Sequence, residues 1–73
     1  MEKLFNTKLY SQKSVKATIE AFDQLAEFKL EHKGDYYKVR VAKLLDPEVE
    51  DRLMDEFGNY ALYQTIAEKK QWQ

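Results

Sequence analysis

Hydrophobic and polar residues alternate in three separate stretches of the chain, and alternation with a period of two is typical of β-strands. The first stretch runs from Leu4 to Leu9, and its residues Phe5 and Leu9 are expected to face the core. The second runs from Glu27 to His32 and the third from Tyr36 to Leu44. The pattern therefore predicts three short strands.

The second and third strands are separated by a short segment that contains Gly34 and Asp35, which predicts a β-hairpin. If these two residues form the turn, four pairs lie opposite each other: Phe28 with Val41, Leu30 with Val39, Glu31 with Lys38, and Lys29 with Arg40. Two pairs are apolar and one joins opposite charges. A turn at Lys33 and Gly34 is the alternative, but it places Lys29 opposite Lys38, so we favour the first register.

Two helices are predicted from apolar residues that recur every three to four positions. The first runs from Gln12 to Ala26, with Ser11 placed to cap its first turn. The second runs from Pro47 to Lys69 or Lys70. Asp46 can accept a hydrogen bond at its start, and Pro47 lacks the N–H group that the first turn would leave unpaired.

The second helix carries more apolar residues than one buried face requires. A broad arc is expected to cover the sheet: Val49, Leu53, Phe57, Tyr60, Ala61, Tyr63 and Ala67. Leu62 and Ile66 lie one turn apart on the opposite side, which they share with Gly58. In one interpretation the helix bends at Gly58 and turns these residues inward. In the other, Met54, Gly58, Leu62 and Ile66 form a stripe that binds a partner or a second copy.

The order of elements is β-α-β-β-α, which predicts an α+β fold. A right-handed crossover makes the first two strands run in the same direction, and the hairpin reverses the third. The third strand is the longest and is expected in the centre. We therefore predict a two-layer sandwich, in which both helices cover one face of a three-stranded mixed sheet. Residues 1–73 are enough for a single domain.

Composition narrows the possible functions. There are 12 basic and 13 acidic residues, a net charge of −1, which predicts no general attraction to nucleic acid or anionic lipid. The chain has one histidine and no cysteine, so a disulfide and a structural zinc site are excluded. The N-terminus does not resemble a signal peptide and no apolar run is long enough for a membrane span, so we expect a soluble cytoplasmic protein. Self-association is the expected stabiliser of so small a domain.

Few residues suggest chemistry. His32 could act as a general base, but the sequence shows no nucleophile beside it, and a histidine packed against Tyr37 next to a turn is the simpler interpretation. The acids at the start of the last helix could attract a cation, yet the helix dipole accounts for them and their spacing matches no calcium-binding loop. We expect no catalytic residue, no metal and no cofactor.

The face of the sheet away from the helices offers an alternative function. Tyr36, Lys38 and Arg40 are expected to lie together on this face. Aromatic and basic residues on a sheet can stack on and hold single-stranded nucleic acid. A solvated sheet face is the simpler interpretation, because Glu27 and Glu31 are expected on the same face.

One segment resembles a known family. Residues Glu56–Gln64 resemble the C-terminal motif of HxsD-like proteins of the His-Xaa-Ser peptide-modification system, and Leu9–Ser11 is similar to that family's beginning. Tyr60 and Leu62 match the motif, and Phe57 is a conservative replacement for leucine. The positions that differ are Gly58, Asn59 (aspartate in the family), Tyr63 and Gln64.

The resemblance implies an accessory role beside radical enzymes that act on a repeat-containing peptide, and it implies no catalytic residue. The pattern of exposed apolar residues leads to a similar expectation, a non-enzymatic binding or adaptor protein. Two kinds of surface could serve. One is the stripe on the last helix, and the other is a sheet edge, Phe5–Leu9 or Glu27–His32, which could accept a partner strand.

Overall fold

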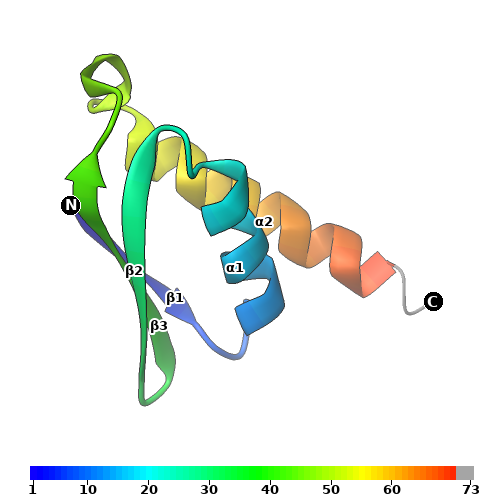
Figure 1. Cartoon of the computed structure of the whole chain (residues 1–73). Helices are drawn as coiled ribbons and strands as arrows, with labels where there is room; N and C mark the ends of the chain where they lie inside the picture. Colours follow the sequence, from blue (N-terminus) through cyan, green and yellow to red (C-terminus); the bar gives the residue numbers. More distant parts are fainter. Residues whose placement is uncertain (71–73) are drawn as a thin grey trace.

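The computed structural model describes residues 1–70 and has the predicted order of elements. These are β1 (Glu2–Asn6), α1 (Gln12–Ala21), β2 (Ala26–Lys33), β3 (Tyr36–Leu44), the 3₁₀ helix η1 (Pro47–Val49) and α2 (Leu53–Lys70). Figure 1 shows the strands in one layer and the two helices packed together in a second layer. The α+β class and the β-α-β-β-α order are therefore confirmed.

The sheet is antiparallel throughout, so the prediction of a mixed sheet is wrong. The strand order is β1-β3-β2, and β3 pairs antiparallel with both neighbours. β1 and β2 do run in the same direction, as the crossover predicts. They are not neighbours, however, because β3 lies between them, and no parallel pair forms in the described part of the chain. The central position of β3 is confirmed.

The hairpin has the predicted register. Phe28 pairs with Val41, Leu30 with Val39, Glu31 with Lys38 and Lys29 with Arg40. Gly34 has a φ of +56°, a left-handed conformation that glycine adopts without steric cost. A bulge falls where Glu27 pairs with Lys43 and Phe28 with Val41, which leaves Ala42 of β3 as the extra residue. The turn at Gly34 and Asp35 is confirmed.

The first strand ends earlier than predicted, and Leu9 does not face the core. Asn6 ends β1: its carbonyl oxygen accepts hydrogen bonds from the amides of Leu9 and Tyr10, and its side-chain oxygen accepts one from Lys8. These bonds turn the chain away from the sheet. Leu9 is left 60% exposed, whereas Phe5 is buried as predicted.

Both helices also differ from their predicted bounds. α1 begins at Gln12 with Ser11 as its cap, as predicted, but ends at Ala21, where Phe22 takes a non-helical conformation. Ala26 then belongs to β2 and pairs with Leu44. Asp46 accepts a hydrogen bond from the Glu48 amide at 3.0 Å as expected, yet it caps η1 and not a continuous helix.

The core lies between one face of the sheet and the two helices. Phe57 is fully buried at its centre, with ring centroids 5.9 Å from Phe5, 5.5 Å from Phe22 and 5.0 Å from Phe28. The buried residues of α2 are Leu53, Phe57, Ala61 and Thr65. The expected arc was too broad on one side, because Tyr63 is exposed.

Candidate interaction surface

Three large apolar side chains lie exposed next to each other on α2. Leu62 and Ile66 are each 47% exposed, and Tyr63, which lies next to Ile66 on the helix surface, is 65% exposed. Positions three and four apart are neighbours on a helix surface, so the three side chains form one patch. We call these residues the α2 patch. The interpretation in which a bend at Gly58 buries Leu62 and Ile66 is wrong.

The other two residues of the predicted stripe have different surroundings. Met54 is half-buried and packs against the core. Gly58 lies under the side chain of Lys3 from β1, whose Cε would be 2.7 Å from a Cβ added at this position. Met54 and Gly58 therefore border the α2 patch but do not extend its apolar surface. The sequence analysis did not include Tyr63 in the exposed stripe, because helical spacing placed it in the arc that was expected to cover the sheet.

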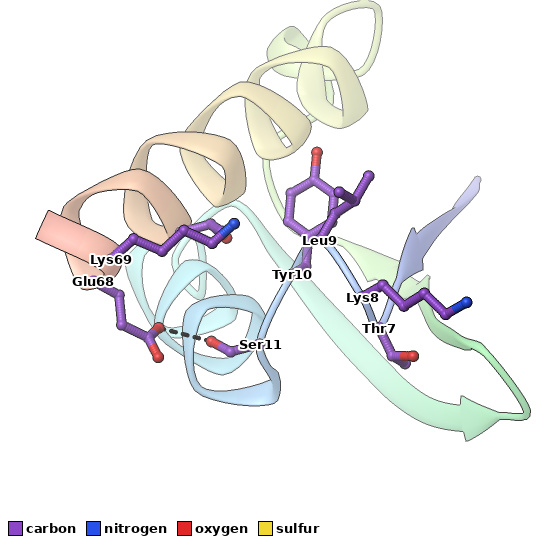
Figure 2. A pocket seen from close by; sticks show the side chains of 8 residues that line it. Thr7, Lys8, Leu9, Tyr10, Ser11, Glu68 and Lys69 are labelled. Atoms are coloured by element: carbon purple, nitrogen blue, oxygen red, sulfur yellow. Dashed lines mark hydrogen bonds between the residues drawn. The ribbon is translucent and has the colours of Figure 1, made fainter. Parts of the chain in front are cut away.

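Two hollows lie along the side of α2 that faces β1 and the following loop. The first is lined by Lys3, Tyr10, Asp55, Gly58, Asn59 and Leu62 and encloses about 360 Å³. The second lies between Thr7–Ser11 and the end of α2, where Ser11 donates a hydrogen bond to Glu68 Oε2 at 2.7 Å (Figure 2). It encloses only about 170 Å³, below the usual range for small-molecule sites of about 300–1,000 Å³.

The two helices are joined by buried hydroxyl groups that the sequence analysis did not find. Ser14 Oγ and Thr65 Oγ1 lie 2.9 Å apart inside the protein. Each also lies within hydrogen-bonding distance of a backbone carbonyl, that of Ser11 for Ser14 and that of Ala61 for Thr65. Small side chains at this contact let α1 and α2 approach closely. Small residues at helical spacing could have indicated this close helix contact. Their polar hydroxyl groups, however, suggest an exposed surface, so the contact was not predicted.

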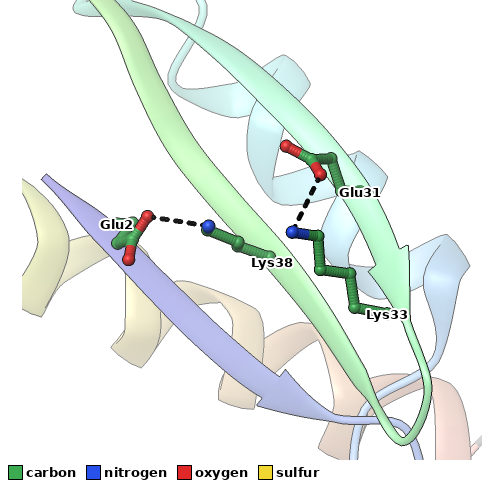
Figure 3. Close-up of polar contacts among 4 residues, drawn as sticks. All are labelled: Glu2, Glu31, Lys33 and Lys38. Atoms are coloured by element: carbon green, nitrogen blue, oxygen red, sulfur yellow. Dashed lines mark ion pairs between the residues drawn. The ribbon is translucent and has the colours of Figure 1, made fainter.

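The open face of the sheet carries mixed charge. The structure places Tyr36, Lys38 and Arg40 together on this face, at alternate positions of β3. Lys38 Nζ forms an ion pair with Glu2 at 3.2 Å, which leaves its side chain 23% exposed (Figure 3). Glu2 forms an ion pair with Lys38, and Glu31 lies across from Lys38 on β2. These two carboxylates weaken the case for an anion-binding surface.

The structure also gives the surroundings of the residues weighed for chemistry. The His32 ring lies beside Tyr37 as expected, with centroids 4.9 Å apart, and its Nε2 donates to the Gly34 carbonyl oxygen at 3.0 Å. Within residues 1–70, no three histidine, aspartate or glutamate side chains come together as a metal site would require. No helix in that part of the chain is long and apolar enough to cross a membrane.

Comparison with known proteins gives no direct guide to function, because no family model, curated protein or solved structure matches the chain. The resemblance of residues Glu56–Gln64 to HxsD-like proteins stays a proposal. The exposed surfaces described above are therefore the features that bear on function.

Proposed function

We propose that this chain is a non-enzymatic binding or adaptor domain that meets its partner through the α2 patch. Gly58 and Met54 border this site, and a second copy of the chain is its first candidate partner. The supporting observation is the exposure of Leu62, Tyr63 and Ile66 side by side on one helix. Contiguous exposed apolar surface on a small domain commonly marks an interaction site, whereas single exposed leucines do not.

The energy available from this patch suits a modest affinity. Complete burial of a leucine or isoleucine stabilises by about 1.5–3 kcal/mol. Because Leu62 and Ile66 are already about half covered, a partner would gain about 1 kcal/mol from each. Tyr63 adds a large ring with a polar end, a residue type common at interfaces. The hollow beside Gly58 can accept a side chain from the partner.

Sedimentation velocity of wild type and Leu62→Asp tests this proposal. A charged group in the α2 patch should abolish association through this patch while leaving the fold unchanged, because position 62 is half-exposed. Leu45→Asp is the matched control, since Leu45 is 43% exposed and lies outside the helix. Equal sedimentation of wild type and Leu62→Asp as monomers would contradict self-association.

The resemblance to HxsD-like proteins supports a narrower version of the same function, in which the adaptor holds a peptide or an enzyme of a modification system. The two matching residues play different parts in the structure. Tyr60 packs against Phe22 with ring centroids 5.6 Å apart, and Leu62 is exposed. Fluorescence anisotropy with a labelled His-Xaa-Ser repeat peptide tests it. Saturable binding that Leu62→Asp weakens supports this version, and unchanged anisotropy opposes it.

Binding of single-stranded nucleic acid is the alternative. It is favoured by one observation, the alignment of Tyr36, Lys38 and Arg40 on the open face. Tyr36 is 44% exposed and could stack on a base. The test is anisotropy of a labelled single-stranded oligonucleotide at low salt, with Arg40→Glu as the variant and Lys13→Glu on α1 as the control. Absence of binding at low salt would remove this alternative.

A further inference from the structure

β2 forms one edge of the sheet, and within residues 1–70 its only neighbouring strand is β3 (Figure 1). It spans Ala26–Lys33 and is longer than β1, the other edge strand. The bulge of the hairpin falls on β3, so the outer edge of β2 is regular. Along an edge strand, every second residue presents unpaired backbone groups that can bond to another strand.

The charges of β2 are complementary to those of a second β2 in the antiparallel direction. An antiparallel pair centred on Leu30 places Lys29 opposite the partner's Glu31 and Glu27 opposite the partner's Lys33. The two-fold symmetry of such a pair repeats both contacts. Every charged residue on the open side of the strand then faces an opposite charge across the interface. Opposite charges at directly facing positions stabilise a strand pair.

The neighbouring registers are disfavoured by the same charges. A shift that keeps the same faces together centres the pair on Lys29 or on Glu31. The first places Lys29 against the partner's Lys29, and the second places Glu31 against the partner's Glu31. Like charges that face each other directly are destabilising. The charge pattern therefore favours the register centred on Leu30 and disfavours the two neighbouring registers.

The core side of β2 is also incomplete at this edge. Phe28 and Leu30 point toward the helices but remain only partly buried. Centred on Leu30, the pair brings the two Leu30 side chains together and covers Phe28 with the partner's His32. Apolar area that the helices leave accessible is then removed from water.

The pairing would also relieve a repulsion within one chain. Lys29 lies opposite Arg40, and among residues 1–70 neither forms an ion pair. Glu31 pairs with Lys33 at 3.6 Å on its own strand (Figure 3) and lies across from Lys38. The partner's Glu31 would supply a negative charge beside Lys29, whereas Arg40 already lies opposite Glu2 of β1.

We propose that two copies of this chain pair antiparallel through β2, centred on Leu30, and form one continuous six-stranded sheet. This interface is separate from the α2 patch and does not depend on it. Lysines at a sheet edge also commonly prevent association. That role does not require glutamates at the self-complementary positions, and the experiment distinguishes the two roles.

The test is a charge exchange measured by sedimentation velocity, with every variant made in the Leu62→Asp chain so that the α2 patch does not contribute. Lys29→Glu and Glu31→Lys each turn two attractive contacts of the dimer into repulsive ones. We expect either change to weaken dimerisation roughly tenfold or more. The double variant K29E/E31K restores complementarity and should dimerise again. An equimolar mixture of the two single variants should form a heterodimer.

Thermal unfolding shows whether a variant loses association because the β2 interface is broken or because the chain no longer folds. Lys29→Glu places a negative charge opposite Arg40 in the same chain, so the monomer should be at least as stable while the dimer is lost. If the Leu62→Asp chain is monomeric at all accessible concentrations, or if the double variant and the mixture fail to associate, the β2 interface is overturned. Loss of association by Leu62→Asp alone would instead locate the contact at the α2 patch.

Discussion

At the scale of single residues, a substitution at Gly58 can distinguish a contribution to the stability of the fold from a contribution to binding. Glycine within a helix costs about 1 kcal/mol relative to alanine. Here the three atoms nearest to an added Cβ all belong to the Lys3 side chain, with the closest approach at Cε. That flexible end can move at little cost. The contact with Lys3 therefore gives little reason for a glycine at this position, and a close approach by a partner chain is the alternative reason.

We expect Gly58→Ala to raise the free energy of unfolding by about 0.5–1 kcal/mol, since the gain in helix propensity exceeds the cost of moving Lys3. Chemical denaturation measures this change. Lys3→Ala should allow the full gain and serves as the second background. If Gly58→Ala stabilises the chain but weakens association, the bare backbone belongs to the interface. A loss of stability in both backgrounds would contradict the prediction.

The buried hydroxyl groups of Ser14 and Thr65 have fewer protons than hydrogen-bonding contacts. Two hydroxyl protons are shared among three short contacts, to each other and to the carbonyls of Ser11 and Ala61. Thr65→Val keeps the shape and leaves Ser14 a carbonyl to which it can donate. We expect a loss of about 1 kcal/mol. The double variant S14A/T65V should lose less than the sum of the single changes, as denaturation of all three variants would show.

At the scale of elements, the hairpin depends on the left-handed conformation of Gly34. No atom of the described residues lies within 4 Å of a Cβ added there, so a substitution tests backbone strain alone. Gly34→Ala should cost about 1 kcal/mol, and Gly34→Asn clearly less because asparagine tolerates this conformation. Thermal unfolding measures both. Equal losses for the two variants would indicate a cause other than backbone strain.

The hairpin was predictable because its information is local. Alternation, a glycine in the turn and opposite charges at facing positions all lie within one segment, and they gave the register correctly. Helical spacing also placed Leu62 and Ile66 on the side of the helix opposite the core, but it left open whether a bend at Gly58 buries them. Leu9 and Tyr63 were not, since their surroundings depend on how Asn6 turns the chain and on which side of α2 meets α1. Such packing joins segments distant in sequence.

The sheet edge shows a different limit. The sequence alone named both Phe5–Leu9 and Glu27–His32 as edges that could accept a strand, with no reason to choose. The structure makes β2 the longer and regular edge and places the bulge on β3. The self-complementary charges were in the sequence throughout. Their role could be inferred only from the fold, in which no other strand of residues 1–70 lies beside the outer edge of β2.

At the scale of the whole molecule, the chain is thin for its length. It extends 40 × 24 × 16 Å, and its radius of gyration is 12.1 Å against about 11 Å expected for a compact domain of this size. A small two-layer protein leaves much of its surface in contact with water and gains little stability from its core. Association would therefore contribute a large share of the total stability.

This leads to a concentration-dependent melting temperature. Because a partner that binds only the folded chain stabilises it by mass action, wild type should melt about 5 °C higher after roughly a hundredfold increase in concentration. Differential scanning calorimetry measures the shift. Leu62→Asp should reduce it if the α2 patch associates, and Lys29→Glu should reduce it if β2 does. The combined variant should melt at one temperature throughout. A constant melting temperature for wild type would contradict both interfaces, because neither could then contribute to the stability of the folded chain.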